Sequence, residues 1–115
     1  MKDFGQLLTA VVTPFDQNGI ISTDTFWRLC KKLVHEKSDG IVLSGTTGES
    51  PTLSHDEHKK IIEETIRITD KRIPVIAGTG SNNTLEAIEY TEHAENSGAD
   101  AALIVTPYYN KPTQL

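Results

Sequence analysis

The chain has 115 residues, of which 37% are hydrophobic and 23% charged, and its formal net charge is −5 at pH 7. This length suits one modest domain, and this composition is typical of a folded domain rather than a disordered one. The negative charge offers no basic face for a phosphate backbone, so we expect no nucleic-acid partner. The sequence shows neither a bilayer-spanning apolar run nor a signal-peptide core, and its single cysteine cannot form an internal disulfide. We therefore expect no membrane partner and a cytoplasmic location.

Short apolar runs alternate along the chain with amphipathic stretches. Residues 7–12 predict a first strand, which ends at Thr13-Pro14. Residues 23–37 carry apolar side chains at helical spacing after a Ser or Thr N-cap, which predicts a helix. Residues 40–44 predict a second strand. The segment from Ser54 to Glu57 fits a capping box, which predicts the start of a second helix.

The same alternation continues to the end of the chain. Residues 73–77 predict a third strand and residues 101–105 a fourth. Between them, residues 84–96 predict a helix that Gly98 ends. The apolar face of this helix is expected to comprise Leu85, Ala87, Ile88 and Ala94.

The order β-α-β-α-β-α-β, with a strand about every 30 residues, indicates successive βαβ units. The strands are continuous apolar runs, which is typical of parallel strands that are covered on both faces. A doubly wound sheet and an eight-stranded barrel both use this pattern, and the pattern alone does not separate them. A barrel needs about 250 residues. Since the sequence stops between a strand and the helix that should follow it, we expect residues 1–115 to be the truncated N-terminal part of one domain.

Function in parallel α/β folds sits at the carboxyl ends of the strands. The loop from Gly45 to Ser50 lies at such an end and offers two threonine hydroxyls and two backbone N–H groups. Such a cluster suits a small carboxylate or an oxyanion, although an ordinary glycine turn has the same composition. A phosphate-binding P-loop is disfavoured because the Gly-Lys-Ser/Thr ending is absent. A dinucleotide fingerprint is disfavoured because Asn83 stands where the third glycine belongs.

Other side chains that could take part in catalysis or metal binding could equally have structural roles. Tyr108 and Tyr109 could relay a proton or could simply pack. His55 and His58 have a spacing that can hold a metal, but no third ligand completes the site, so we expect no metal and interpret both as polar residues at the start of a helix. Cys30 is expected in the core rather than as a nucleophile. The remaining histidines are expected to be solvated, namely His35 and His93.

Three motifs in succession resemble the dihydrodipicolinate synthase family. They are the sequence GTTGES at 45–50, PVIAGTG at 74–80 and VTPYYNKP at 105–112. The resemblance covers essentially the whole chain, in order and at the family spacing. It implies a (β/α)8 TIM barrel, of which this chain would supply about the first half.

The resemblance implies that the parent enzyme condenses pyruvate with aspartate 4-semialdehyde, on the route to diaminopimelate and lysine. Its catalytic lysine forms a Schiff base with pyruvate, and no cofactor is expected. Thr47 matches the residue that holds the pyruvate carboxylate, and Thr46 and Tyr109 match two members of a hydroxyl proton relay. The Schiff-base lysine would lie beyond Leu115, and Lys111 does not match it, so we expect the isolated chain to be inactive.

The resemblance also implies assembly and regulation. In the family, the residue at Tyr109 reaches into a neighbouring subunit, which implies a homo-oligomer, a dimer of dimers. A feedback site for lysine matches at Ser50, His55, His58, Asn82, Glu86 and Tyr108. Pro51 stands where some lysine-sensitive members have Ala. The same residues could equally be polar interface residues without a ligand.

Two other hypotheses remain open from the sequence alone. The chain could be a non-catalytic half-barrel that serves as an interaction module or a remnant. It could also belong to another pyruvate-dependent lyase or aldolase of the same family, because most residues that choose the acceptor substrate would lie beyond Leu115.

Overall fold

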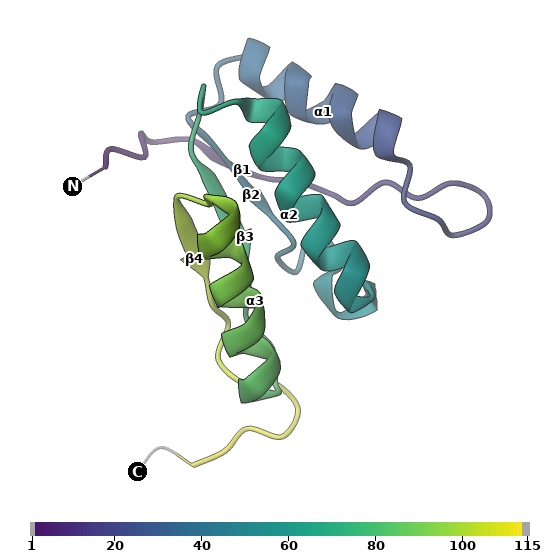
Figure 1. Ribbon diagram of the computed structural model, residues 1–115, viewed down its shortest axis with the longest axis vertical. Coiled ribbons are helices and arrows are strands. Elements are labelled where there is room, and N and C mark those ends of the chain that lie inside the picture. Colours follow the sequence, from purple (N-terminus) through teal and green to yellow (C-terminus); the bar gives the residue numbers. More distant parts are fainter. Residues whose placement is uncertain (1, 114–115) are drawn as a thin grey trace.

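The computed structural model describes residues 2–113 and consists of a parallel sheet with helices along one face (Figure 1). The strands are β1 Leu8–Ala10, β2 Gly40–Leu43, β3 Val75–Gly78 and β4 Ala101–Leu103. The helices are α1 Thr23–His35, α2 His55–Thr69 and α3 Thr84–Ser97, with a short 3₁₀ turn, η1, at Ser50–Thr52.

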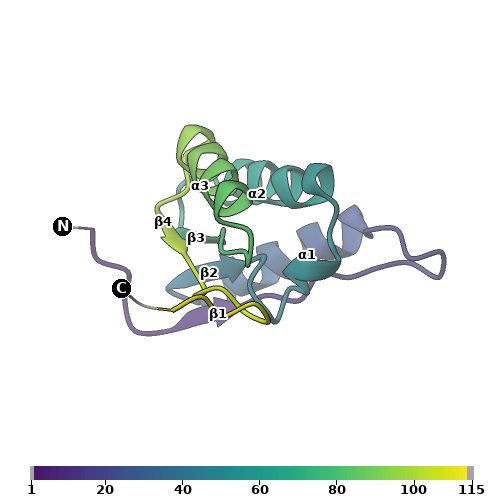
Figure 2. The same ribbon diagram turned by 90° about the horizontal axis from the view of Figure 1, so that it is seen from below.

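The strand order β1-β2-β3-β4 follows the sequence order, and every neighbouring pair is parallel. Each new strand is therefore added to the same edge of the sheet. A doubly wound sheet reverses direction at a switch point, and the helices then cover both faces. Here α1, α2 and α3 lie along one side of the strands (Figure 2). The observed winding is that of one half of a closed barrel, which confirms the predicted fold class.

The core lies between the sheet and the helices. Ile41 and Leu43 of β2 and Val75 and Ala77 of β3 are at most 2% exposed and belong to one apolar cluster with side chains of α1 and α2. Side chains alternate between the faces of a strand. The other face of the sheet carries partly exposed apolar side chains at its two edges: Leu8, Val12, Leu103 and Val105. The sheet is parallel, as predicted, and only one of its faces is covered by helices (Figure 2).

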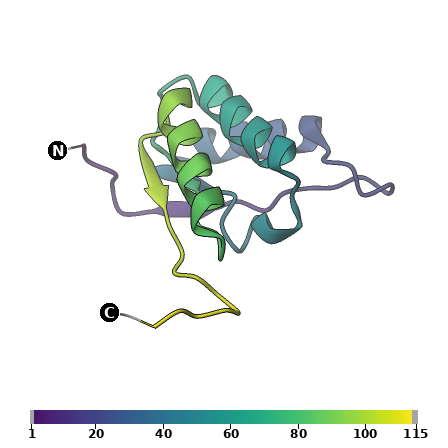
Figure 3. The same cartoon turned by 60° about the horizontal axis from the view of Figure 1, so that its bottom comes forward.

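The strands are shorter than the sequence predicts. Ser44 adopts φ of 52°, which is left-handed and ends β2 one residue early. Residues 104 and 105 lie outside β4, and Ile104 shares a hollow with Ala87, Ile88 and Thr91 of α3, along which the chain passes beyond the strand (Figure 3). Apolar character continues past these points, so composition alone does not reveal where the backbone leaves the ladder.

The predicted starts of the helices agree with the structure. Ser54 accepts a hydrogen bond from the backbone N–H of Glu57, whose carboxylate accepts from the N–H of Ser54, which confirms the capping box. Gly98 ends α3 with φ of 95°, as expected. The helix α1 ends at His35, two residues before the predicted boundary.

The predicted apolar face of α3 is partly wrong. Leu85 and Ile88 are 77% and 49% exposed, whereas Tyr90 and Ala94 are buried. Tyr90 turns its ring against His58 of α2, so an aromatic contact between helices fixes the rotation of α3.

Two carboxylates fasten the amino-terminal ends of the strands. Asp39, just before β2, accepts hydrogen bonds from the backbone N–H groups of Gln6 and Leu7. These bonds hold the pKa of Asp39 below its usual range. Asp100, just before β4, accepts from the N–H of Val75 at 2.8 Å and pairs with Lys2. Side-chain hydrogen bonds therefore join neighbouring strands at their amino-terminal ends, in addition to the backbone bonds within the sheet.

Exposed apolar side chains on the helix-free face predict self-association of the 115-residue chain by itself. Replacing Leu103 by Lys on this face should shift the chain toward smaller species in sedimentation velocity, because a charge there opposes burial. Leu85→Lys is the matched control, since Leu85 is also exposed but lies on α3. An unchanged distribution for the Leu103 variant would contradict this interpretation.

Candidate functional site

A hollow of about 530 Å³ opens at the carboxyl ends of β2, β3 and β4. It is lined by the start of the Gly45–Ser50 loop, the end of β3 and part of the tyrosine segment, residues 106–110. The lining residues are Ser44, Gly45, Thr46, Ser50, Pro51, Gly78, Gly80, Leu103, Ile104, Val105 and Tyr108. Its walls combine apolar strand residues with a few hydroxyl groups, which is the usual composition of a small-molecule site.

The turn at 45–49 presents free backbone donors at the rim of this hollow. Its own hydrogen bonds run from Gly48 N to Gly45 O and from Glu49 N to Thr46 O, both at 3.0 Å. The N–H groups of Gly45, Thr46 and Thr47 donate to no backbone carbonyl among the described residues. Both threonines are exposed. Free N–H groups in successive positions attract an anion, so this geometry suits a carboxylate.

Surrounding contacts hold this turn in place. Buried Thr13 donates its hydroxyl hydrogen to the carbonyl of Gly48 at 2.7 Å, which joins the segment after β1 to the turn. Ser44 and Glu49 flank the turn with φ of 52° and 57°. Left-handed backbone at residues other than glycine costs about 1–3 kcal/mol each and concentrates at functional sites.

The tyrosine segment brings only one of its two phenols to the hollow. Tyr108 lines it, whereas Tyr109 is 94% exposed and has φ of 65°. Asn110 donates its side-chain amide to the carbonyl of Asn82 at 3.2 Å, which joins this segment to the loop after β3. The structure therefore brings Thr46, Ser50 and Tyr108 together, and leaves Tyr109 pointing into solvent.

Of the residues matched to a lysine site, His55 and Glu86 form a polar contact between α2 and α3, whereas Ser50 and Tyr108 line the hollow at the strand ends. His55 Nε2 lies 2.8 Å from Glu86 Oε1, and the other carboxylate oxygen of Glu86 accepts from Ser81. Sequence reasoning missed Ser81 because a loop serine before a helix is expected to act as a cap. Asn82 is half-buried and contributes its backbone carbonyl rather than its side chain.

His58 differs from the sequence-based expectation of a polar residue at the start of a helix. It is 1% exposed, and its Nε2 donates to the carbonyl of Gly78 at 2.8 Å. Its ring stacks on Tyr90 with centroids 3.9 Å apart, and its Nδ1 is buried with no partner among the described residues. Burial lowers the pKa of His58 and raises the pKa of Tyr90 to about 12.

The other singled-out side chains have structural roles. Cys30 is fully buried, and burial raises the pKa of its thiol to about 11, which agrees with a core residue. His35 is exposed, as predicted. His93 is not simply solvated, because its Nε2 lies 2.8 Å from a carboxylate oxygen of Glu63 and its Nδ1 is buried. Within residues 2–113, no group of three His, Cys, Asp or Glu side chains is arranged to hold a metal.

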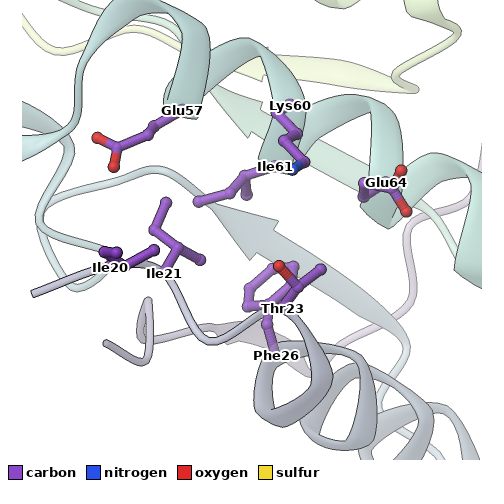
Figure 4. A pocket seen from close by; sticks show the side chains of 8 residues that line it. All are labelled: Ile20, Ile21, Thr23, Phe26, Glu57, Lys60, Ile61 and Glu64. Carbon is purple, nitrogen blue, oxygen red and sulfur yellow. The ribbon is translucent and has the colours of Figure 1, made fainter. Parts of the chain in front are cut away.

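A smaller hollow of about 170 Å³ lies between α1 and α2 (Figure 4). Ile21, Phe26 and Ile61 form its apolar floor, and Glu57 and Lys60 stand at its rim. None of residues 45–50 and 106–110 lines it. Its lining comes from α1, α2 and the loop before α1, and shares no residue with the hollow at the strand ends.

Fold and site together define a β/α-barrel protein with a turn of free backbone donors at the carboxyl ends of its strands. Residues 3–115 match the model of the dihydrodipicolinate synthetase family. The chain belongs to this family, and its strands and helices correspond to the first part of the family's (β/α)8 barrel.

Individual relatives agree with this assignment. The 4-hydroxy-tetrahydrodipicolinate synthase of Rhizobium meliloti (strain 1021) is 58% identical over 107 residues, which cover 93% of this chain and 36% of the relative. Among solved structures, the Acinetobacter baumannii enzyme complexed with pyruvate has a TM-score of 0.93 at 49% identity and covers 96% of this chain and 38% of its own. The Cyanidioschyzon merolae enzyme with lysine bound has a TM-score of 0.91 at 41% identity and similar coverage, 96% and 38%. The chain thus spans about a third of the length of the relatives that it matches.

No helix among residues 2–113 combines the length and the apolar character needed to cross a bilayer.

Close backbone packing below the hollow predicts a sharp difference between two glycines. A Cβ atom on Gly78 would overlap the carbonyl oxygen of Ser44 and lie 2.7 Å from the nitrogen of Gly45. A Cβ atom on Gly45 would meet only a side-chain carbon of Leu103 at 3.9 Å. Gly78→Ala should therefore lower the free energy of unfolding by about 1–3 kcal/mol, as overpacking does, and Gly45→Ala should change it little. Urea unfolding of both variants measures this, and equal losses would contradict it.

The lowered pKa of His58 predicts a pH dependence of stability. The unfolded chain binds a proton on this imidazole at a pKa of about 6.5, whereas the folded chain resists protonation. Protonation therefore favours the unfolded state, and stability should fall as the pH decreases below about 6.5. Around the ring, His55 and His93 reinforce this effect and Glu86 opposes it.

His58→Gln should remove this contribution. Urea midpoints at pH 7.5 and 5.5 should differ less for the variant than for the unchanged chain, even if the variant is less stable at both values. His35→Gln, at an exposed histidine, should leave the difference as it is. Identical pH dependence in all three chains would show that His58 binds its proton equally well in both states.

Proposed function

We propose that this chain forms the substrate-binding half of a 4-hydroxy-tetrahydrodipicolinate synthase, which condenses pyruvate with aspartate 4-semialdehyde. The observation that carries the proposal is the turn at 45–47, which has free N–H groups and two exposed threonines, and of which Gly45 and Thr46 line a partly apolar hollow. A 2-oxo acid with a short apolar tail needs these two surfaces side by side. The Acinetobacter baumannii relative, which is complexed with pyruvate, supports this substrate.

In the proposed mechanism, Thr47 holds the carboxylate of pyruvate through its hydroxyl and backbone N–H. Thr46 and Tyr109 pass protons to and from the reacting carbons as members of a hydroxyl relay. A lysine amine attacks the ketone and loses water to form a protonated imine, whose electron demand lets a methyl proton leave. No described lysine lines the hollow, so this lysine comes from outside the 115-residue chain and the chain alone is inactive.

The position of Tyr109 supports a proposal about assembly. Its side chain is 94% exposed on a left-handed residue, an arrangement that makes sense where a second subunit covers the ring. We propose that the enzyme is a homo-oligomer, a dimer of dimers, in the cytoplasm. Each subunit then lends its tyrosine to the site of its neighbour.

The polar contact between α2 and α3 belongs to a proposed site for feedback by lysine. His55 and Glu86 supply charge for an amino acid, while Ser50, Asn82 and Tyr108 lie around the adjoining loops. The Cyanidioschyzon merolae relative has lysine bound, which supports this assignment. His58 belongs to the site by position, although its buried ring already bonds to Gly78 and its Nε2 is not free for a ligand.

The chief competing function is a non-catalytic half-barrel that binds other protein. The exposed apolar residues on the helix-free face favour it. A different pyruvate-dependent lyase of the family would share the anion-binding turn and differ in its acceptor. Trapping of pyruvate separates the non-catalytic half-barrel from the synthase, and product formation with aspartate 4-semialdehyde separates another lyase from it.

The test joins this chain to the remainder of the Rhizobium meliloti synthase, in place of the 107 residues that match. The chimera should give a covalent adduct with pyruvate and borohydride and should form product with aspartate 4-semialdehyde. Thr47→Val, which removes one hydroxyl from the carboxylate site, should raise the KM for pyruvate about tenfold, the effect expected from losing one charge-assisted hydrogen bond. Thr47→Ser is the matched control and should stay within about threefold.

The isolated 115-residue chain should give no adduct, and an adduct on any of its own lysines would overturn the proposed division of roles. A folded chimera that traps pyruvate but makes no product with the aldehyde would point to another lyase. A folded chimera that does not trap pyruvate at all would favour the non-catalytic half-barrel.

A further inference from the structure

We infer that His58 is a positioning residue that sets the geometry of the substrate turn from the opposite side of the sheet. The inference rests on the proposed function, because it assigns a role toward the ligand of that turn. It is carried by three contacts in series: from Tyr90 to the imidazole, from the imidazole to Gly78, and from Gly78 to the peptide that begins the turn.

The first contact fixes the ring. His58 lies between α2 and α3 at 1% exposure, and its stack on Tyr90 has an interplanar angle of 20°. A carbonyl oxygen can only accept, so the bond of 2.8 Å to Gly78 requires that Nε2 carries the proton. In the neutral ring, Nδ1 is then an unprotonated nitrogen, buried without a partner. The ring thus keeps the bond to Gly78 although its other nitrogen has no partner among the described residues.

The second contact places the end of β3. The carbonyl of Gly78 is the last of the strand, at the point where the chain enters the Gly-Thr-Gly loop. A last carbonyl in an outer loop would ordinarily bond to water. Here the imidazole N–H of His58 on α2 donates to this carbonyl instead, which fixes the orientation of the Gly78 peptide.

The third contact transmits this position to the turn. Gly78 packs so closely against the Ser44–Gly45 peptide that a Cβ atom would fall 2.7 Å from Gly45 N. Ser44 is itself held in a left-handed conformation, and the N–H groups that follow it are the free donors of the turn. A shift of Gly78 therefore moves the donors that would face the ligand, although the side chain of His58 does not itself line the hollow.

A Gln and Asn pair at position 58 tests this chain of contacts in the chimera described above. His58→Gln carries an amide N–H at about the reach of Nε2 and should retain kcat/KM for pyruvate within about threefold. His58→Asn stays polar but falls short of Gly78, and should lower kcat/KM by roughly 10- to 100-fold, since a misplacement of about 1 Å has that effect. His35→Asn, at an exposed histidine, is the control and should leave turnover unchanged.

Hydrogen exchange of the peptide covering residues 44–50 provides a second measurement that does not depend on turnover. Exchange should accelerate in His58→Asn and not in His58→Gln, while peptides of α1 remain as they were. Equal behaviour of the Gln and Asn variants, either both active or both impaired with the same exchange, would overturn the inference. If the unchanged chimera does not trap pyruvate, the proposed function fails, and the exchange result still decides whether His58 positions the turn.

Discussion

The close approach of Gly78 to the Ser44–Gly45 peptide is the constraint on which the candidate site depends. Side chains usually separate the end of one strand from the loop that follows a neighbouring strand. Here a residue without a Cβ atom lets the end of β3 rest directly on the first peptide of the substrate turn. The turn therefore has a floor made of backbone, which is stiffer than one made of side chains. The left-handed Ser44 and Glu49 can persist because this packing leaves the backbone few alternatives.

Much of the fold follows from the sequence because its signals are local. The capping box at Ser54, the glycine at position 98 and the apolar runs each indicate an element without knowledge of its partners. The ends of the strands are not predictable in this way. Ser44 leaves β2 because of the left-handed backbone that the turn requires, and a serine in a run of apolar residues gives no sign of it.

The site is predictable to a similar extent and for the same reason. Motif order and spacing point to Thr46, Thr47 and the tyrosine pair, and the structure gives the first of these a hollow to line. Sequence reasoning did not anticipate that His58 is buried against Tyr90, because the contact joins two helices whose relative rotation is set by packing. The exposed Leu85 and Ile88 show the same limitation, since helical periodicity shows which residues share a face but not which face meets the core.

The carboxylates below the sheet have a consequence for how such a protein can change over evolution. Asp39 and Asp100 join neighbouring strands at the rim opposite the hollow, through bonds to backbone N–H groups that any residue supplies. These hydrogen bonds join the strands at their amino-terminal ends, while the hollow lies at their carboxyl ends. Mutations in the loops around the hollow leave the hydrogen bonds of Asp39 and Asp100 intact. Loop residues around the hollow can therefore vary without loss of these hydrogen bonds between strands.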